Sequence, residues 1–279
     1  YIKFFILFGL LASFSANAIL EVNIIKSKED SFPIVIAPFK FIGDSKGSVD
    51  IAKIIRDNLN RSGQFNALST NELIDNQIDF NFWQEHKKDA VVFGKIEQVS
   101  SKVFNIYIYI YDVLTQKALY QKKIAVHNSG FRRIAHYLSD KIYYVLLGQK
   151  GSFDTRLSYV TVSDNKSGGR TYRLQISDSD GYNPQTVVRS SYPILSPAWS
   201  SDHNKLAYVS FKNNRSEVFV IHPFLKTKTI KLPRFDGIAS SPTWHPNGES
   251  LALTISKKGN KDIYLYNFKS QELKRLTTN

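Results

Sequence analysis

Apolar residues in the first quarter of the chain form one strand-like run and then one helical repeat. The run "PIVIAPF" predicts a strand at about 34–39. A polar turn follows, and apolar side chains then recur at helical spacing until Gly63 ends the repeat. These side chains are Val49, Ala52, Ile55 and Leu59. The pattern therefore predicts a strand followed by an amphipathic helix.

A second strand and a second, shorter helix are predicted directly afterwards. The strand lies near 65–68. Ser69 or Thr70 is then expected to begin the helix as its N-cap. Glu72 stands near the third helical position, which is typical of a capping box.

Three further apolar segments, 90–100, 103–115 and 118–128, predict a meander of strands. The middle segment clearly alternates Ile with Tyr. An amphipathic helix from Phe131 ends at Gly148 and closes the unit. Residues 19–150 are therefore predicted to form an α/β N-terminal domain with a mixed sheet.

The second half of the chain repeats itself. The segment "SPAWSSDHNKLAYVS" at 196–210 returns as "SPTWHPNGESLALTI", and Trp199 and Trp244 are 45 residues apart. The third strand of each copy, "EVFVIH" and "DIYLYN", keeps the same offset. A fixed period of this length, built from four short strands, is typical of β-propeller blades.

Simple physical rules predict the role of each part of the repeat. We expect Ser-Pro-x-Trp to open the innermost strand, where proline is tolerated, and the indole to fill the wedge between blades. Asn247 and Gly248 predict the tight turn to the second strand.

An earlier, degenerate copy has its second, third and fourth strands at 156–162, 171–178 and 184–188. Its first strand is absent, and propellers often close their ring with a strand from the other end of the chain. Residues 151–279 give two to three blades, whereas a ring needs at least four. We therefore expect an incomplete, all-β propeller in a sequence that has been cut short, with exposed strand edges and poor solubility.

The first 18 residues resemble a secretory signal peptide. Lys3 precedes an apolar stretch, and Ala16 and Ala18 form the small-x-small pattern of a cleavage site. A membrane anchor is the alternative, but the apolar stretch is shorter than the roughly 20 residues needed to span a bilayer. The leader therefore predicts export. No Met stands first, so the initiator residue is expected to be missing.

Composition changes this picture little. The net charge is +13 and the chain has no cysteine, which excludes thiol nucleophiles and thiolate metal sites. Basic residues are scattered singly through a sequence rich in Lys, Asn and Ile. An exported chain with this pattern is not expected to bind nucleic acid.

Motifs for catalysis are weak. The segment "GDSKG" at 43–47 matches the Gly-x-Ser-x-Gly elbow of serine hydrolases, with Ser45 as the nucleophile. Too few strands precede it for a hydrolase sheet, so a polar turn is the better interpretation. The six histidines show no metal-binding spacing, and "SGG" at 167–169 lacks the Lys-Ser/Thr of a phosphate loop and predicts a hairpin turn. No catalytic residue, metal or cofactor is predicted.

The chain resembles the TolB family of periplasmic propeller proteins over nearly its whole length. The resemblance depends on the leader, "EVNI", "PIVIAPF", "RLSYVTV" and above all "LQISDSDGYNPQTVVRSSYPILSPAWS". Full members carry six blades and are not enzymes. The resemblance implies a monomeric scaffold of the Tol-Pal system that links the outer-membrane lipoprotein Pal to TolA. It would touch membranes only through these partners and serve outer-membrane integrity and constriction during division.

The resemblance also implies two binding elements. The TolA-binding segment would be Glu21, Val22, Asn23, Ile24, Ile25 and Lys26. Ile19 and Leu20 precede the usual glutamate, and the alternative is an ordinary first strand. The Pal-binding face would be Arg234, Phe235, Asp236, Gly237, Ile238, Ala239 and Ser240. This loop is longer than the Asn-Gly-Ala-Pro form usual in the family, and a plain connecting loop is the alternative.

Two other functions stay open from sequence. The repeats would also suit the propeller half of an exported peptidase of the prolyl-oligopeptidase type. A propeller that binds sugar or peptidoglycan is the third hypothesis, with Tyr182 and Trp199 as platforms.

Overall fold

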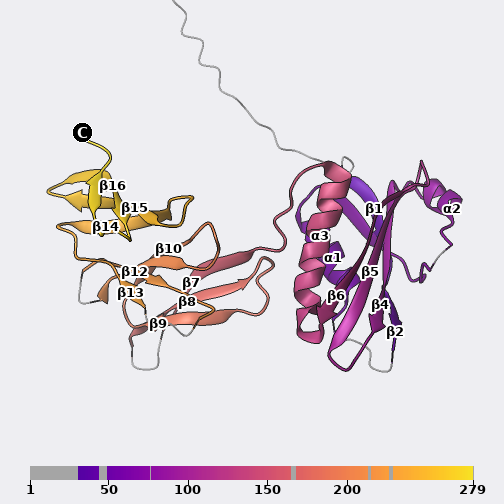
Figure 1. Cartoon of the computed structure of the whole chain (residues 1–279), viewed down its shortest axis with the longest axis horizontal. Coiled ribbons are helices and arrows are strands. Elements are labelled where there is room, and N and C mark those ends of the chain that lie inside the picture. The colour runs from indigo at the N-terminus through magenta and orange to yellow at the C-terminus, as the bar shows by residue number, and fades with distance from the viewer. Residues whose placement is uncertain are drawn as a thin grey trace, which may run out of the picture.

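A computed structural model describes residues 31–43, 49–75, 77–164, 168–212, 215–225 and 229–278. The described chain has two parts, an α/β part and an all-β part, joined after helix α3 (Figure 1). The predicted leader and the predicted TolA-binding segment lie outside the described residues. None of the helices described is long and apolar enough to cross a membrane.

The α/β part is built on one mixed sheet of six strands. Its strands are β1 Phe32–Ile36, β2 Lys40–Ile42, β3 Phe65–Ser69, β4 Ala90–Gln98, β5 Val103–Asp112 and β6 Ala118–His127. The order is β3-β1-β4-β5-β6, with β2 on β4. Strands β1, β2 and β3 make parallel pairs, whereas β4, β5 and β6 form the predicted antiparallel meander. The predicted mixed sheet is confirmed.

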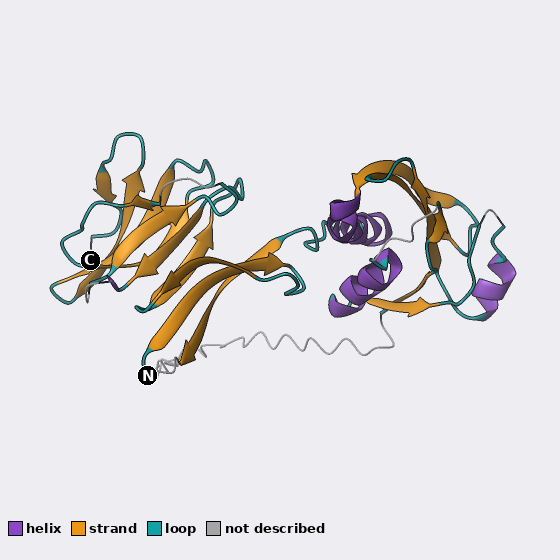
Figure 2. Ribbon diagram, turned by 90° about the horizontal axis from the view of Figure 1, so that it is seen from below, coloured by secondary structure: helices purple, strands orange, loops and turns teal. Residues whose placement is uncertain are grey.

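Two helices, α1 Ile51–Arg61 and α3 Phe131–Leu147, pack on one face of this sheet (Figure 2). Their buried side chains meet the isoleucines of β5, which are fully buried. Asp50 caps α1 by accepting the Lys53 N–H at 2.9 Å. Gly148 ends α3 in the left-handed conformation, with φ 69°. Both helices confirm the sequence prediction.

The short helix predicted to begin at Ser69 or Thr70 is wrong. The Thr70 hydroxyl accepts the backbone N–H of Glu72 at 3.1 Å, so the capping residue closes a local turn instead. Helix α2 lies later in the chain, at Phe80–Glu85, and the Asp79 side chain caps its N-terminus. Its Trp83 is buried on the sheet face opposite α1 and α3. The strand predicted at about 34–39 is displaced: β1 covers 32–36, and residues 37–39 connect it to β2.

The all-β part consists of three antiparallel sheets. The first is β7 Arg156–Asp164, β8 Arg170–Asp178 and β9 Gln185–Ser190. The second is β10 Ile194–Trp199, β11 Leu206–Ser210, β12 Glu217–Ile221 and β13 Ile230–Lys231. The third is β14 Ile238–Trp244, β15 Ser250–Lys257, β16 Asn260–Asn267 and β17 Leu273–Arg275. Three and four described strands per sheet match the predicted incomplete propeller, and the described residues give the first sheet no innermost strand.

The Ser-Pro-x-Trp motifs do not open their strands. Strands β10 and β14 begin earlier, and the motif occupies the last four residues of each. Ser196 and Ser241 both have φ 49°, and the pairing register shifts at each motif. Proline cannot donate to the ladder, so a β-bulge places it where no donor is needed.

The two motif tryptophans differ in their surroundings. Trp244 is 8% exposed, stacks on Phe268 at 5.3 Å and donates its Nε1–H to the Ala198 carbonyl of the preceding sheet at 3.1 Å. This indole fills the wedge between two sheets, as predicted. Trp199 stacks on Phe224 at 6.1 Å, and its buried Nε1 has no hydrogen-bond partner among the described residues. In the repeat, the matching carbonyl would come from the innermost strand, which the described part of the first sheet lacks.

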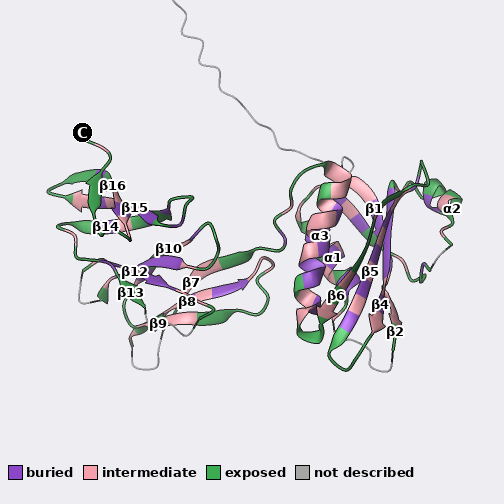
Figure 3. Cartoon of the chain, in the orientation of Figure 1, coloured by how far each residue is buried: buried purple, intermediate pink, exposed green. Residues whose placement is uncertain are grey.

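Figure 3 shows buried residues along the middle strands of these sheets.

Candidate functional site

The predicted Pal-binding residues lie between the second and third sheets. Arg234 to Gly237 form the loop after β13, whereas Ile238, Ala239 and Ser240 already belong to β14. The structure thus brings all seven together as one loop and strand start. The other predicted element, 21–26, lies outside the described residues.

Two residues fix the shape of this loop. The half-buried Phe235 ring packs edge-on against Tyr266, with centroids 6.1 Å apart. Gly237 has φ 144°, and a Cβ atom there would lie 2.5 Å from the Ser256 carbonyl oxygen. Only glycine fits this position without moving the backbone. The loop is therefore held in one shape.

The tip of the loop carries an exposed ion pair. The Asp236 carboxylate lies 2.5 Å from Lys257 Nζ, and the Asp236 side chain is 83% exposed. The hydrogen bond from Lys257 lowers the pKa of Asp236, and the same bond raises the pKa of Lys257. Such an exposed pair contributes little to stability.

A cavity of about 360 Å³ opens beneath the loop. Glu217, the first residue of β12, is buried in its lining. Its Oε1 lies 2.6 Å from Lys231 Nζ and 3.8 Å from Arg234 Nε. Next to it, the Ser216 hydroxyl accepts the Ala239 N–H at 2.9 Å and ties the two sheets together. The predicted loop is therefore one wall of a charged cavity that sequence reasoning did not find.

A second charged cluster joins the α/β part to the first sheet. Arg132 of α3 donates from Nε to Asp178 at 3.0 Å and from Nη2 to Asp180. Its guanidinium also lies over the Tyr182 ring, 3.8 Å from the centroid. All three ionic side chains are less than a third exposed. We call this group, Arg132 with Asp178 and Asp180, the junction clamp.

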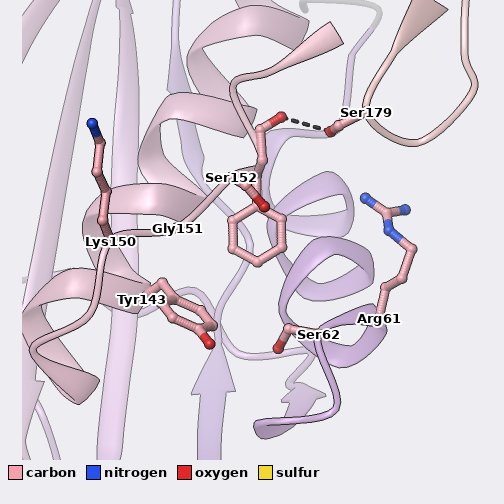
Figure 4. A pocket seen from close by; sticks show the side chains of 8 residues that line it. Arg61, Ser62, Tyr143, Lys150, Gly151, Ser152 and Ser179 are labelled. Carbon is pink, nitrogen blue, oxygen red and sulfur yellow. Dashed lines mark hydrogen bonds between the residues drawn. The ribbon is translucent and has the colours of Figure 1, made fainter. Parts of the chain in front are cut away.

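A second set of hydrogen bonds supports the same junction. The Asp140 carboxylate accepts the N–H groups of Phe153 and Asp154 at 2.8 and 2.9 Å. The Ser179 hydroxyl donates to the Phe153 carbonyl at 2.6 Å (Figure 4). Ser179 and the segment 150–153 line a cavity of about 340 Å³, which Figure 4 shows from close by. Three hydrogen bonds thus hold the connecting segment between α3 and the first sheet.

His136 comes close enough to the clamp to raise the question of a metal site. Its side chain, Asp178 and Asp180 offer ligand atoms within 4.8 Å of one another. However, His136 Nδ1 accepts from the Asn58 amide at 2.9 Å, and Arg61 fixes that amide by donating to its oxygen at 2.7 Å. The proton of neutral His136 is therefore on Nε2, the atom facing the carboxylates. With Arg132 already on both carboxylates, the geometry favours an ion-paired junction over a metal centre.

Lower pH is expected to weaken this junction. Burial lowers the pKa of His136 from its ordinary value of 6.5, and the positive charge of Arg132 lowers it as well. The carboxylates of Asp180, Asp178 and Asp154 act to raise this pKa but do not reverse the shift. The unfolded chain therefore takes up a proton that the folded chain resists, so stability falls as pH drops below about 6.5.

Asp180 adds to the same trend at more acidic pH. Burial acts to raise its pKa, but hydrogen bonds from Arg132 and the Tyr182 N–H outweigh this and lower the pKa.

Urea unfolding between about pH 7 and about pH 5 should show a steeper loss of stability in the wild type than in His136→Gln. Equal pH slopes for the two proteins would contradict this.

The remaining sequence candidates are the histidine His127, the serine of the GDSKG segment and the two aromatic platforms. Ser129 donates to His127 Nδ1 at 2.9 Å, and that nitrogen also accepts the Ser129 N–H at 3.4 Å, which makes the imidazole the cap of a 3-10 helix. Ser45 lies outside the described residues. Of the two proposed sugar platforms, Tyr182 has Arg132 over its ring, and Trp199 is half-buried against Phe224.

Comparison with known proteins gives one consistent result. The profile of the TolB amino-terminal domain matches residues 20–119, and that of the TolB beta propeller domain matches residues 143–279. A curated relative from Ruthia magnifica subsp. Calyptogena magnifica, "Tol-Pal system protein TolB", is 59% identical over 263 residues, which are 94% of this chain and 62% of the relative. A protein of the same description from Vesicomyosocius okutanii subsp. Calyptogena okutanii is 55% identical over 91% of this chain and 60% of its own length.

A solved structure agrees with the sequence matches. The crystal structure of TolB from Acinetobacter baumannii superposes with a TM-score of 0.77 at 33% identity, and the match covers 89% of this chain and 61% of that one. The chain thus spans about 60% of the length of these relatives.

Proposed function

Because the chain belongs to the TolB family, we propose that it is a non-enzymatic periplasmic scaffold of the Tol-Pal system. In this role it links an outer-membrane, Pal-like lipoprotein to TolA of the inner-membrane complex. The link serves outer-membrane integrity and constriction during cell division. The leader-like residues 1–18 support export to the periplasm.

The observation that carries the proposal is the two-part fold with its clamp. The loop at 234–240 belongs to the propeller part, whereas 21–26 precedes β1 of the α/β part. The junction clamp joins the two parts through side chains that are mostly buried. A protein built this way can hold one partner on each part. Loops that gather at one face of a rigid scaffold are common binding sites, and an extended terminal segment can add as a strand to a partner's sheet.

Deleting residues 21–26 tests the TolA half of this proposal. In the native protein, the deletion is expected to abolish binding to the purified periplasmic part of TolA and to leave binding of the lipoprotein unchanged. Calorimetric titration of each partner measures both. The control variant keeps residues 21–26 and carries Lys274→Ala at an exposed position.

Two results would contradict this assignment. Unchanged TolA affinity after the deletion would remove the segment as the TolA site. A large drop in melting temperature would show instead that residues 21–26 form an ordinary strand packed on their own domain.

A further inference from the structure

The cavity beneath the 234–240 loop carries more positive than negative charge. Arg215, Lys231 and Arg234 line it, and the Glu217 carboxylate lies near Lys231 and Arg234. Asp236 also lies in the lining, but it is paired with Lys257 outside the cavity. Three cations against the single carboxylate of Glu217 leave an excess of positive charge at this boundary between two sheets.

Glu217 does not saturate these cations. It binds Lys231 closely, at 2.6 Å, but Arg234 Nε stays at 3.8 Å, beyond hydrogen-bond distance. The Arg234 side chain is 68% exposed. Within the part of the chain that the structure describes, no carboxylate forms an ion pair with Arg215. Two guanidinium groups are therefore available to an incoming ligand.

The shape of the cavity also suits a side chain carried on a protein. Its volume of about 360 Å³ exceeds that of one side chain, and Ile238 offers a 58% exposed apolar surface at its edge. The wall formed by Phe235 and Gly237 is fixed by packing and by backbone geometry. A fixed wall lowers the entropy cost of binding. Guanidinium groups hold carboxylates through paired, charge-assisted hydrogen bonds.

We propose that this cavity receives an acidic side chain of the lipoprotein partner, held by Arg215 and Arg234. The inference rests on the proposed function and names the chemistry of its propeller site. Lys231 stays on Glu217, which sets the position of that ammonium and keeps part of the cavity neutral. The partner surface is therefore acidic where it meets the loop.

Charge reversal in the native full-length protein tests this assignment. The partner is the soluble domain of the lipoprotein from the same organism, titrated at low and at high salt. Arg234→Glu is expected to weaken binding by at least about tenfold at low salt, because a repulsive pair replaces an attractive one. Lys274→Glu, an equal charge change on the outer strand β17, should change the affinity less than about twofold.

Glu217→Gln separates this inference from the opposite one, in which the partner inserts a lysine toward Glu217. An acidic ligand binds equally well or more tightly once the carboxylate is neutralised, whereas a basic ligand binds more weakly. Melting temperatures show whether each variant is folded, and Arg215→Glu tests the second guanidinium group in the same titration.

The outcomes distinguish the inference from the proposed function. Wild-type affinity in both arginine variants, or weaker binding in Glu217→Gln, overturns the acidic contact and leaves the scaffold role intact. Failure of the wild-type protein to bind the lipoprotein overturns both. Recovery of Arg234→Glu binding by an acid-to-lysine change in the lipoprotein supports the contact directly.

Discussion

Replacing Trp244 with alanine is expected to lower the free energy of unfolding by about 3–5 kcal/mol. The indole is 8% exposed, stacks on Phe268 and donates to the Ala198 carbonyl of the preceding sheet. Its removal leaves a cavity between two sheets and a buried carbonyl without its donor. Urea unfolding followed by circular dichroism measures the change.

Trp199→Ala is the matched control, because it changes the same position of the preceding repeat. Trp199 is only half-buried, and its Nε1 has no partner among the described residues. The expected loss is about half as large, or less, because fewer contacts and no hydrogen bond are removed. Equal losses for the two variants would contradict the role assigned to the indole of Trp244.

Arg132→Ala is expected to lower the free energy of unfolding by about 2–4 kcal/mol, because it leaves two partly buried carboxylates without their cation. Asp178 and Asp180 are 29% and 15% exposed at the side chain. The same change removes the guanidinium from the Tyr182 ring. Hydrogen exchange should show faster exchange in α3 and β8, the two elements that the clamp joins.

Arg133→Ala is the control for the clamp. Arg133 is the next residue of α3, is 78% exposed and lies 3.6 Å from Asp154. Its loss is expected to cost less than about 1 kcal/mol, as is usual for exposed pairs. If both arginine variants unfolded alike, the junction would be held by the backbone segment around Phe153 rather than by the clamp.

Regular patterns in the sequence predict most of the fold. In β5, Ile106, Ile108 and Ile110 are fully buried, while the intervening tyrosines are half-buried, as the alternation predicts. The 45-residue repeat predicts the strand order of the second and third sheets. Periodicity succeeds here because burial itself imposes it.

Local signals that have two physical uses are less reliable. The Thr70 hydroxyl can cap a helix or close a turn, and here it closes a turn. A proline in a strand can stand at the start or at a bulge, and the positive φ of Ser196 and Ser241 shows that it stands at a bulge. Tertiary packing decides between such alternatives, and the local sequence does not contain it.

Functional sites made from distant segments are the hardest to predict. The loop at 234–240 follows from the repeat and the family resemblance, but its cavity also needs Arg215 and Glu217 from the preceding sheet. His136 and Asp178 are likewise 42 residues apart in the chain and meet only at the junction. Sequence spacing carries no signal for either of these two contacts.

Crosslinking in the living source cell tests the central claim most directly, when the native protein is captured and everything attached to it is identified by mass spectrometry. The scaffold role predicts crosslinks to a Pal-like lipoprotein from the 234–240 loop and crosslinks to TolA from residues 21–26. Capture of neither partner, under conditions where the protein itself is recovered intact, would contradict it.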